Sequence, residues 1–511
     1  MTWRAAVLAA AVLAAGAILS FRPIYEPDLW WHLAQGRETA EGRLVRTNVF
    51  SFTHPDYRQH FTPWLYDVGL YGAWQAFGPA GIQLVQAGCL SLTFWLLFAA
   101  GRIRAPAWSV AAALLIGFVI LEPRAIPRPH LVSFAGMAAC VLLVERAAAA
   151  RSAAPLRAAI PLVALWSNLH VECVFGVLLL GVFSLSEHLR PASLPRAEAR
   201  RALAWTCLAA LATLANPYGW GLWAYLYENA AVPQLMAIAE LRPPYLPEYR
   251  AFYAYAGICA ILLLSQWRSL TAWETAVAVI FAVLGARYLR LTPLLLLATA
   301  PMVAARLARL ADRGVDRRAV LITAACAAFV LSRVPPRLLV TELAAGREAV
   351  EPPQFFSPAA IAFIEGAELE GPVFNSHNLG GYLAWTMYPR VRIFQDSRLQ
   401  AYPPEHFRAI IAASREQALW EALTADVGWA VLSVPRPNQL SGHGRFAEPE
   451  WRTVYRDGAI EVVIRRRTGS TSNLQPPTSK ELPTSNFQRT STSDVQRIPS
   501  VEPPERLDVG S

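Results

Sequence analysis

Residues 80–104 read AGIQLVQAGCLSLTFWLLFAAGRIR, and this stretch decides the class of fold. Positions 80–100 carry no charged side chain, whereas Arg102 and Arg104 follow at once. A helix needs about 20 mostly apolar residues to cross the hydrocarbon layer of a membrane, and arginine collects in connections on the cytoplasmic side. The stretch therefore predicts a membrane-spanning helix that ends at the cytoplasmic face.

The composition of the whole chain agrees with this interpretation. Its 511 residues are 54% hydrophobic and 16% charged, whereas a soluble protein carries about 25% charged residues. The net charge of +9 comes from short basic clusters between apolar stretches, which argues against the continuous basic patch of a nucleic-acid-binding protein. The six cysteines form no C-x-x-C pair, so a zinc site is not predicted.

About eleven stretches are apolar enough to span a membrane, if shorter helices are allowed inside a bundle. The first is expected to remain as an uncleaved helix, because no small-x-small cleavage site follows it. The predicted spans are 4–21, 80–100, 107–121, 131–146, 157–168, 170–187, 202–216, 251–266, 271–286, 289–305 and 319–333.

Arginine marks every second connection between these spans. Arg-rich connections follow the second, fourth, sixth, eighth and tenth spans, and the positive-inside rule places them in the cytoplasm. The rule thus predicts a cytoplasmic N-terminus and an extracytoplasmic segment after residue 333. The first outer connection, 22–79, includes an amphipathic segment at 64–77 that is expected to lie in the outer membrane interface.

From about residue 335 the composition becomes that of a small globular domain. Strands and helices form an α/β pattern, and Asp457-Gly458 is typical of a hairpin turn. Strands are expected in 371–375, 390–396, 429–435 and 453–466, and helices in 378–388, 404–413 and 415–424.

The sequence thus predicts three parts. A bundle of membrane-spanning helices occupies 1–334, and an extracytoplasmic α/β domain occupies 335–467. The tail at 468–511 is rich in Ser, Thr and Pro with few large apolar residues, so it is expected to be disordered.

Ionisable residues gather in the connections that are predicted to face outwards. A charged group at membrane depth costs roughly 2.5–3.5 kcal/mol on insertion scales, so a cluster of them suggests a shared cleft at the outer surface. Two carboxylates one residue apart, Glu26 and Asp28, would supply a general base or a pair of metal ligands. Asp28 is the residue that we expect to be catalytic.

The same connections carry basic and amide side chains. Arginine binds phosphate through paired, charge-assisted hydrogen bonds, and histidine transfers protons near neutral pH. The predicted donor phosphate-binding residues are Arg124, Arg128, Arg287 and Arg290, and the other residues predicted to line the cleft are His32, His130, Asn168 and His170.

Each of these residues also has a purely structural interpretation. An arginine at a helix end can simply contact lipid headgroups, and an isolated histidine there is more often a structural hydrogen-bonding group than a catalytic one. Trp30 and Trp31 are interpreted as membrane-interface residues rather than as a platform for a sugar ring. Asp396 and Arg398, in the α/β domain, are interpreted as a structural ion pair.

Four motifs connect these residues to a known group. They are D-x-W-W-H at Asp28 to His32, R-P-H at Arg128 to His130, W-x-N-x-H at Trp166 to His170, and G-G-Y-L with D-x-R between Gly380 and Arg398. With them, residues 20–465 resemble the GT-C superfamily of membrane glycosyltransferases. This superfamily includes the protein O-mannosyltransferases of glycosyltransferase family 39 and the lipid A aminoarabinose transferases. The chain looks most like a group of poorly characterised bacterial multi-spanning proteins that share the four motifs.

The resemblance implies a chemistry. GT-C enzymes use polyprenyl-phosphate-linked sugars and place the catalytic carboxylate in the first outer loop. Asp28 would then be the base and Glu26 its partner, or both would hold a divalent cation such as Mg²⁺ or Mn²⁺; no cofactor is predicted with certainty. Val171 and Glu172 follow His170 where the resemblance predicts glycine.

We therefore expect a glycosyltransferase of a bacterial inner membrane. It would move a sugar from a polyprenyl-phosphate carrier to a glycan, lipid or protein acceptor at the outer face, with membrane lipid and not nucleic acid as its further partner. Two alternatives stay open. One is a transporter or flippase for a lipid-linked saccharide, which should place charges near the bilayer midplane, and the other is a non-catalytic membrane scaffold.

Overall fold

A computed structural model of the chain describes residues 3–18, 20, 24, 26–231, 243–245, 249–310, 357–434, 442, 444–446 and 449–466. The predicted last span at 319–333 and the predicted tail at 468–511 lie outside these residues. The chain up to Arg466 forms one compact unit.

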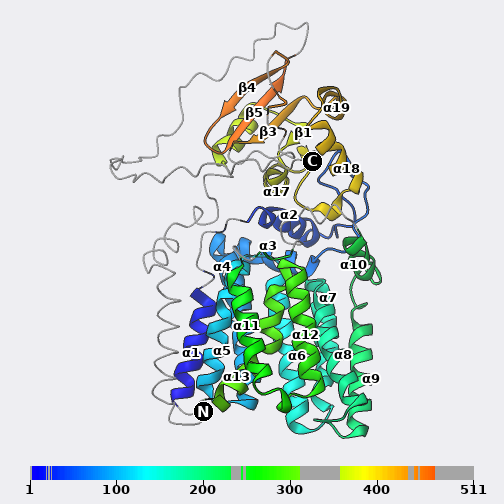
Figure 1. The fold of residues 1–511 in the computed structure, drawn as a ribbon. Coiled ribbons are helices and arrows are strands. Elements are labelled where there is room, and N and C mark those ends of the chain that lie inside the picture. The colour runs from blue at the N-terminus through cyan, green and yellow to red at the C-terminus, as the bar shows by residue number, and fades with distance from the viewer. Residues whose placement is uncertain are drawn as a thin grey trace, which may run out of the picture. The chain divides into compact units, whose positions relative to one another are not determined.

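Every predicted span inside the described residues corresponds to a helix, and these helices lie side by side in a bundle (Figure 1). Short connections join most of them, several through 3₁₀ turns. The helices are α1 (Trp3–Ile18), α4 (Pro79–Arg104), α5 (Ala107–Leu121), α6 (His130–Ala150), α7 (Ala159–Leu169), α8 (Cys173–Leu189), α9 (Arg196–Ala212), α11 (Arg250–Leu264), α12 (Ala272–Arg287) and α13 (Thr292–Leu310).

Among the described residues, three helical stretches are both long and apolar enough to cross a membrane. They are Pro79–Arg104, His130–Ala150 and Leu289–Arg309. Shorter apolar helices occur at Ala5–Ala14, Ala107–Phe118, Cys173–Leu189 and Arg250–Leu264. The mostly helical fold is therefore confirmed, whereas the predicted number of about eleven spans is not.

Two helices lie across one end of the bundle, the end away from the start of α1 (Figure 1). α3 (Trp64–Phe77) has the bounds predicted for the interfacial segment. α2 (Asp28–Ala40) is absent from the sequence-based prediction. Residues 29–36 of α2 are buried without interruption, so this stretch lacks the solvent-exposed face by which an amphipathic helix is usually identified.

Among the described residues between 357 and 466, five strands form one sheet with helices around it. Its strand order is β2-β1-β3-β5-β4; β1 pairs in parallel with β2 and β3, and β5 pairs antiparallel with β3 and β4. The strands are β1 (Gly371–Asn375), β2 (Val391–Ile393), β3 (Trp429–Ser433), β4 (Trp451–Arg456) and β5 (Ile460–Arg465), and the helices are α16 (Pro358–Gly366), α17 (Gly380–Met387), α18 (Pro404–Ala413) and α19 (Gln417–Leu423). The predicted small sheet domain is therefore confirmed.

The first outer connection and the C-terminal domain share one hydrophobic core. Leu29 and Leu33 of α2 belong to the same buried cluster as Leu383 of α17 and Val431 of β3. In the same cluster Trp30 packs edge-on against Tyr382, with ring centroids 5.0 Å apart. Burying these large side chains contributes roughly 1.5–3 kcal/mol each, so α2 and the C-terminal domain stabilise each other.

This shared core contradicts the interpretation of Trp30 and Trp31 as membrane-interface residues. Their exposed fractions are 1% and 7%, because α17 packs directly over α2. The contact is close: a Cβ added at Gly381 would lie 3.1 Å from the Trp31 backbone nitrogen and 3.2 Å from the Pro27 carbonyl oxygen.

Candidate active site

Glu26, Asp28 and Arg128 meet where the first outer connection passes the turn before α6. One guanidinium nitrogen, Arg128 Nη2, lies 2.7 Å from Glu26 Oε1 and 3.0 Å from Asp28 Oδ2. Glu26 Oε1 also accepts the Asp28 backbone N–H at 3.1 Å. Burial raises the pKa of Glu26, and Arg128 opposes this shift. The structure thus brings together the two predicted carboxylates and one predicted arginine.

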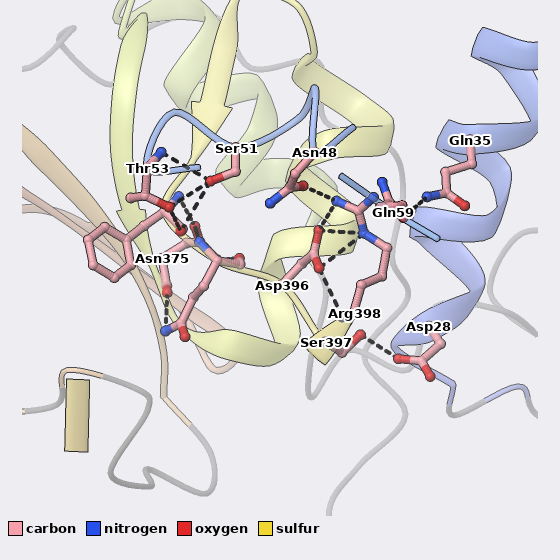
Figure 2. A network of polar contacts seen from close by, with 12 residues as sticks. Asp28, Gln35, Asn48, Ser51, Thr53, Gln59, Asn375, Asp396, Ser397 and Arg398 are labelled. Carbon is pink, nitrogen blue, oxygen red and sulfur yellow. Dashed lines mark hydrogen bonds and ion pairs between the residues drawn. The ribbon is translucent and has the colours of Figure 1, made fainter. Parts of the chain in front are cut away.

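The C-terminal domain contributes a side chain to Asp28. The Ser397 hydroxyl donates a hydrogen bond to Asp28 Oδ1, as Figure 2 shows. The two oxygens of the Asp28 carboxylate are therefore held by residues that are far apart in the sequence, one by Arg128 and the other by Ser397. The side chain of Asp28 stays partly accessible, with 15% of its surface exposed, so it can meet a substrate.

Behind Ser397 lies a fully buried ion pair. Arg398 and Asp396 have no exposed side-chain surface, and Arg398 Nε donates to Asp396 Oδ2 at 2.9 Å. Arg398 Nη2 also donates to Asn48 Oδ1 at 2.9 Å (Figure 2). The pair therefore binds the first outer connection to the C-terminal domain, in agreement with its structural interpretation.

The polar network continues from Arg398 into the two helices at the end of the bundle. The side-chain amide of Gln35 takes the orientation that satisfies both of its polar atoms. Its oxygen accepts a hydrogen bond from Arg398 Nη1 at 2.9 Å, and its nitrogen donates one to Asp67 Oδ2 at 3.0 Å. His32 Nδ1 lies 2.6 Å from Asp67 Oδ1. Burial lowers the pKa of His32 well below its usual value and raises the pKa of Asp67. His32 is thus an internal member of the network rather than a side chain on the wall of a cleft.

A second polar group lies between α6, α7 and α8. The Ser133 hydroxyl is 2.7 Å from His170 Nδ1 and accepts a hydrogen bond from Trp166 Nε1 at 3.0 Å. Glu172 Oε2 lies 3.5 Å from the same His170 nitrogen, and Glu172 Oε1 lies 3.5 Å from Arg290 Nη2. Because Ser133 and Glu172 approach the same ring nitrogen, this arrangement is not the nucleophile–histidine–acid relay of a hydrolase.

The remaining predicted residues have varied surroundings. Arg124 is buried, and its carbonyl oxygen accepts a hydrogen bond from His130 Nε2 at 2.7 Å. Asn168 accepts a hydrogen bond from Trp64 Nε1 and donates to the Ala164 and Ala215 carbonyls. Arg287 is exposed and its guanidinium lies 4.8 Å from the centroid of the Tyr288 ring.

Three of these residues have surroundings that differ from those predicted for a cleft lined with arginine and histidine. His130 and Asn168 make hydrogen bonds to backbone carbonyl groups. Within the described part of the chain, the Arg287 guanidinium lies against the Tyr288 ring and not against Glu26 or Asp28. Arg290 reaches Glu172 rather than the Glu26 and Asp28 pair.

Sequence reasoning missed two members of the site, Ser397 and Asp67. Ser397 is the middle residue of the D-x-R motif, so the motif was the available signal. Asp67 lies within α3, which the sequence predicts as an amphipathic helix, so its carboxylate is interpreted as part of the polar face. Only the packing of α2 against α3 reveals its partner His32.

The carboxylates do not have the surroundings of a divalent metal site. Within the described part of the chain, no group of three or more His, Cys, Asp or Glu side chains is arranged to hold a metal ion. Mg²⁺ and Ca²⁺ take about six or more oxygen ligands, whereas Glu26 and Asp28 already share the positive charge of Arg128. The residues present therefore do not fit the divalent cation that the resemblance implies.

The chain has similarity to known proteins at the level of the fold. No protein-family model matches the sequence, and no curated protein matches it. The apo crystal structure of the Archaeoglobus fulgidus oligosaccharyltransferase aligns with a TM-score of 0.53 and 12% identity, over 83% of this chain and 69% of that one. The oligosaccharyltransferase AglB from Archaeoglobus fulgidus, in complex with an inhibitory peptide and a dolichol-phosphate, aligns with a TM-score of 0.56 and 13% identity, over 84% and 70% of the two chains. The chain shares the fold of these archaeal oligosaccharyltransferases, which agrees with the fold implied by its resemblance to the GT-C superfamily.

Proposed function

We propose that the protein is a membrane glycosyltransferase that uses a sugar carried on a polyprenyl phosphate. The observation that carries this proposal is Asp28, a partly exposed carboxylate whose two oxygens are held by Arg128 and Ser397. A carboxylate fixed in this way is suited to general base catalysis. The shared fold adds support, because one of the archaeal enzymes was solved with a dolichol-phosphate and a peptide.

In the proposed reaction Asp28 takes the proton of an acceptor hydroxyl. The acceptor oxygen attacks the anomeric carbon of the sugar, and the bond between that carbon and the phosphate oxygen breaks. The electron pair of this bond goes to the phosphate, which leaves as polyprenyl phosphate. Arg124 and Arg290 are the proposed ligands of the phosphate, since charge-assisted hydrogen bonds stabilise the leaving anion. A glycan, a lipid and a protein are all candidate acceptors.

The proposal includes a location. We place the protein in a bacterial inner membrane with about eleven spans, the N-terminus in the cytoplasm, and the α/β domain at 335–467 outside. The Arg-rich connections support this orientation. The site then lies at the outer surface, where α2 and α3 cross the end of the bundle (Figure 1).

The test compares wild type with Asp28→Asn in transfer from radiolabelled polyprenyl-phosphate sugars by purified protein. We expect the variant to lose at least about 100-fold in kcat, because asparagine keeps the shape but cannot accept the proton. Asp56→Asn is the matched control, since Asp56 is an exposed acid in the same connection.

Unchanged transfer by Asp28→Asn would show that the proposed base is wrong. Binding of the lipid-linked sugar by both proteins without any turnover would instead favour the transporter or the scaffold.

A further inference from the structure

The position of Arg128 relative to the two acids is the starting point. Its Nη2 atom lies between the carboxylates, 2.7 Å from Glu26 Oε1 and 3.0 Å from Asp28 Oδ2. A cation that bridges two carboxylates one residue apart has the place that a divalent metal ion would take between the same two groups.

The backbone around Arg128 holds this side chain in place. Pro127 and Pro129 flank it in the sequence, and each proline fixes its own φ near −65°. The Arg128 N–H donates to the Ile126 carbonyl at 2.7 Å, and the Arg128 carbonyl accepts from Leu131 N–H at 3.1 Å. Arg128 is therefore presented by a rigid turn immediately before α6.

Both carboxylates that face Arg128 also accept hydrogen bonds from other donors. Glu26 Oε1, which faces Arg128, accepts the Asp28 N–H, and the second Asp28 oxygen, Oδ1, accepts the Ser397 hydroxyl. A metal ion at this point would have to displace these donors and would lie next to a guanidinium that stays protonated at any pH the protein meets. The repulsion between the two cations disfavours metal binding.

We propose that Arg128 is a built-in replacement for a divalent cation, so that the Glu26 and Asp28 pair excludes Mg²⁺ and Mn²⁺ while Arg128 is present. The exclusion of metal is independent of the reaction. Its consequence, sugar transfer without added metal, rests on the proposed function.

Binding of Mn²⁺ tests the exclusion directly. Electron paramagnetic resonance measures free Mn²⁺ during titration of the purified full-length chain in lipid nanodiscs, after removal of metal with EDTA. Arg128→Gln removes the charge and Arg128→Lys keeps a charge. Two further variants lack the carboxylates: Glu26→Gln with Asp28→Asn, and the triple variant that adds Arg128→Gln to these two changes.

We expect wild type and Arg128→Lys to bind no Mn²⁺ at this site. Arg128→Gln should bind Mn²⁺ at least about tenfold more tightly than the weakest binding that the titration detects, because the two carboxylates then lack the Arg128 counter-ion, and the triple variant should lose this binding. Mn²⁺ bound by wild type and lost on Glu26→Gln with Asp28→Asn would overturn the proposal. A folded Arg128→Gln protein that binds no Mn²⁺ would also overturn it, because Arg128 would then not be what excludes the ion.

If Arg128→Gln does not fold, Arg128→Met replaces it in the same titration with the same expected result, and Mn²⁺ bound by wild type at this site overturns the proposal without any variant at Arg128. Transfer activity with and without EDTA is measured separately on wild type. Equal activity supports metal-independent transfer, and activity restored only by metal overturns it. Absence of transfer under both conditions would reject the proposed function while the Mn²⁺ result still decides the exclusion.

Discussion

The hydrogen bond and the ion pair that hold the Asp28 carboxylate come from segments that are far apart in the sequence. Ser397 reaches it from the loop after β2, and Arg128 reaches it from the turn before α6. A hydrogen bond to a charged group contributes about 1.5–3 kcal/mol, so each contact fixes the direction of the carboxylate. The orientation of Asp28 therefore depends on correct packing of both the bundle and the C-terminal domain.

Replacing Ser397 should impair the reaction step more than substrate binding. We expect Ser397→Ala to lower kcat by about 10- to 100-fold, which corresponds to the loss of one hydrogen bond to a carboxylate, with little change in the KM for the donor. Ser397→Thr keeps the hydroxyl and should restore most of the rate. Ser414→Ala is the control, because the Ser414 hydroxyl donates only to the Ile411 carbonyl of its own helix among the described contacts. Full kcat in Ser397→Ala would mean that Arg128 suffices to orient Asp28.

A buried histidine in the C-terminal domain makes stability depend on pH. Burial, with smaller contributions from His54 and His377, lowers the pKa of His406 to about 3 from a usual value of 6.5. Between pH 6.5 and about pH 3, His406 is therefore protonated in the unfolded chain but neutral in the folded chain. The contribution of His406 to stability is present above pH 6.5 and is lost as the pH falls, by about 1.4 kcal/mol per pH unit.

His406→Phe should reduce this loss, since phenylalanine keeps a ring that can stack on Tyr402. The measurement is the melting temperature of wild type and variant between pH 7 and pH 4, and the melting temperature of wild type should fall more steeply than that of the variant as the pH falls. His188→Gln changes an exposed histidine and should leave the slope as in wild type. Parallel curves for wild type and His406→Phe would contradict the lowered pKa.

Several residues of the site were predictable from chemistry alone. Glu26, Asp28 and Arg128 were expected together because acids and arginines recur in the outward connections, and the structure joins them. Arg287 was chosen on the same grounds but lies exposed beside Tyr288. Charge and position in a connection do not specify the direction of a side chain, and this is why reasoning from the sequence could not separate the two arginines.

At the scale of the elements, the crossing of α2 and α3 is closer than side chains usually allow. A Cβ at Gly36 of α2 would lie 2.2 Å from the Asp67 carbonyl oxygen and 2.8 Å from Tyr71 Cβ. Any side chain at this position must push the two helices apart. The spacing of the helices places His32 beside Asp67, so Gly36 also protects the polar network.

Gly36→Ala should therefore destabilise the protein by about 1–3 kcal/mol. Gly69→Ala is the matched control on α3, because a Cβ there has no heavy atom within 4 Å, and alanine should stabilise the helix by about 0.5–1 kcal/mol. Melting temperatures of the two variants should move in opposite directions. Equal effects would show that α2 and α3 can separate without cost.

Elements with a clear period were predicted well, and α2 was not. The bounds of α3 and α5 match the predicted 64–77 and 107–121, since long apolar or amphipathic runs identify a helix by themselves. α2 is buried on all sides by other parts of the chain. It is buried partly by α3, about 30 positions away, and partly by α17, about 350 positions away, and no local pattern of sequence contains these contacts.

At the scale of the whole molecule, the first outer connection depends on the C-terminal domain. Arg37 Nη1 donates to the Trp385 carbonyl at 2.9 Å, and the Phe52 N–H donates to the Ile393 carbonyl at 3.1 Å. Ser51 also pairs with Ile393 in an isolated parallel bridge. The first outer connection is thus bound to the C-terminal domain through its backbone as well as through its side chains.

A chain that ends at residue 356 should keep the bundle but lose the structure of residues 26–78. Without α17 and the sheet, the apolar side chains of α2 lose their partners in the C-terminal domain and keep only those in α3 and α4, so local stability falls with the lost burial. Hydrogen exchange should become fast in α2 and stay slow in α6. A chain that ends at residue 467 is the control and should exchange like the full chain. Slow exchange of α2 in the shorter chain would show that the first connection folds by itself.

The long-range contact between Asn48 and Arg398 also has a consequence for biosynthesis. These residues are 350 positions apart, and ribosomes add about 5–20 residues per second. Arg398 is therefore synthesised on the order of 20 to 70 s after Asn48. During this time the segment around α2 exposes tryptophan and leucine side chains that the finished protein hides. Assembly of the acid pair with Ser397 is thus a late event, and a nascent chain cannot act on a substrate before the end of the α/β domain has been made.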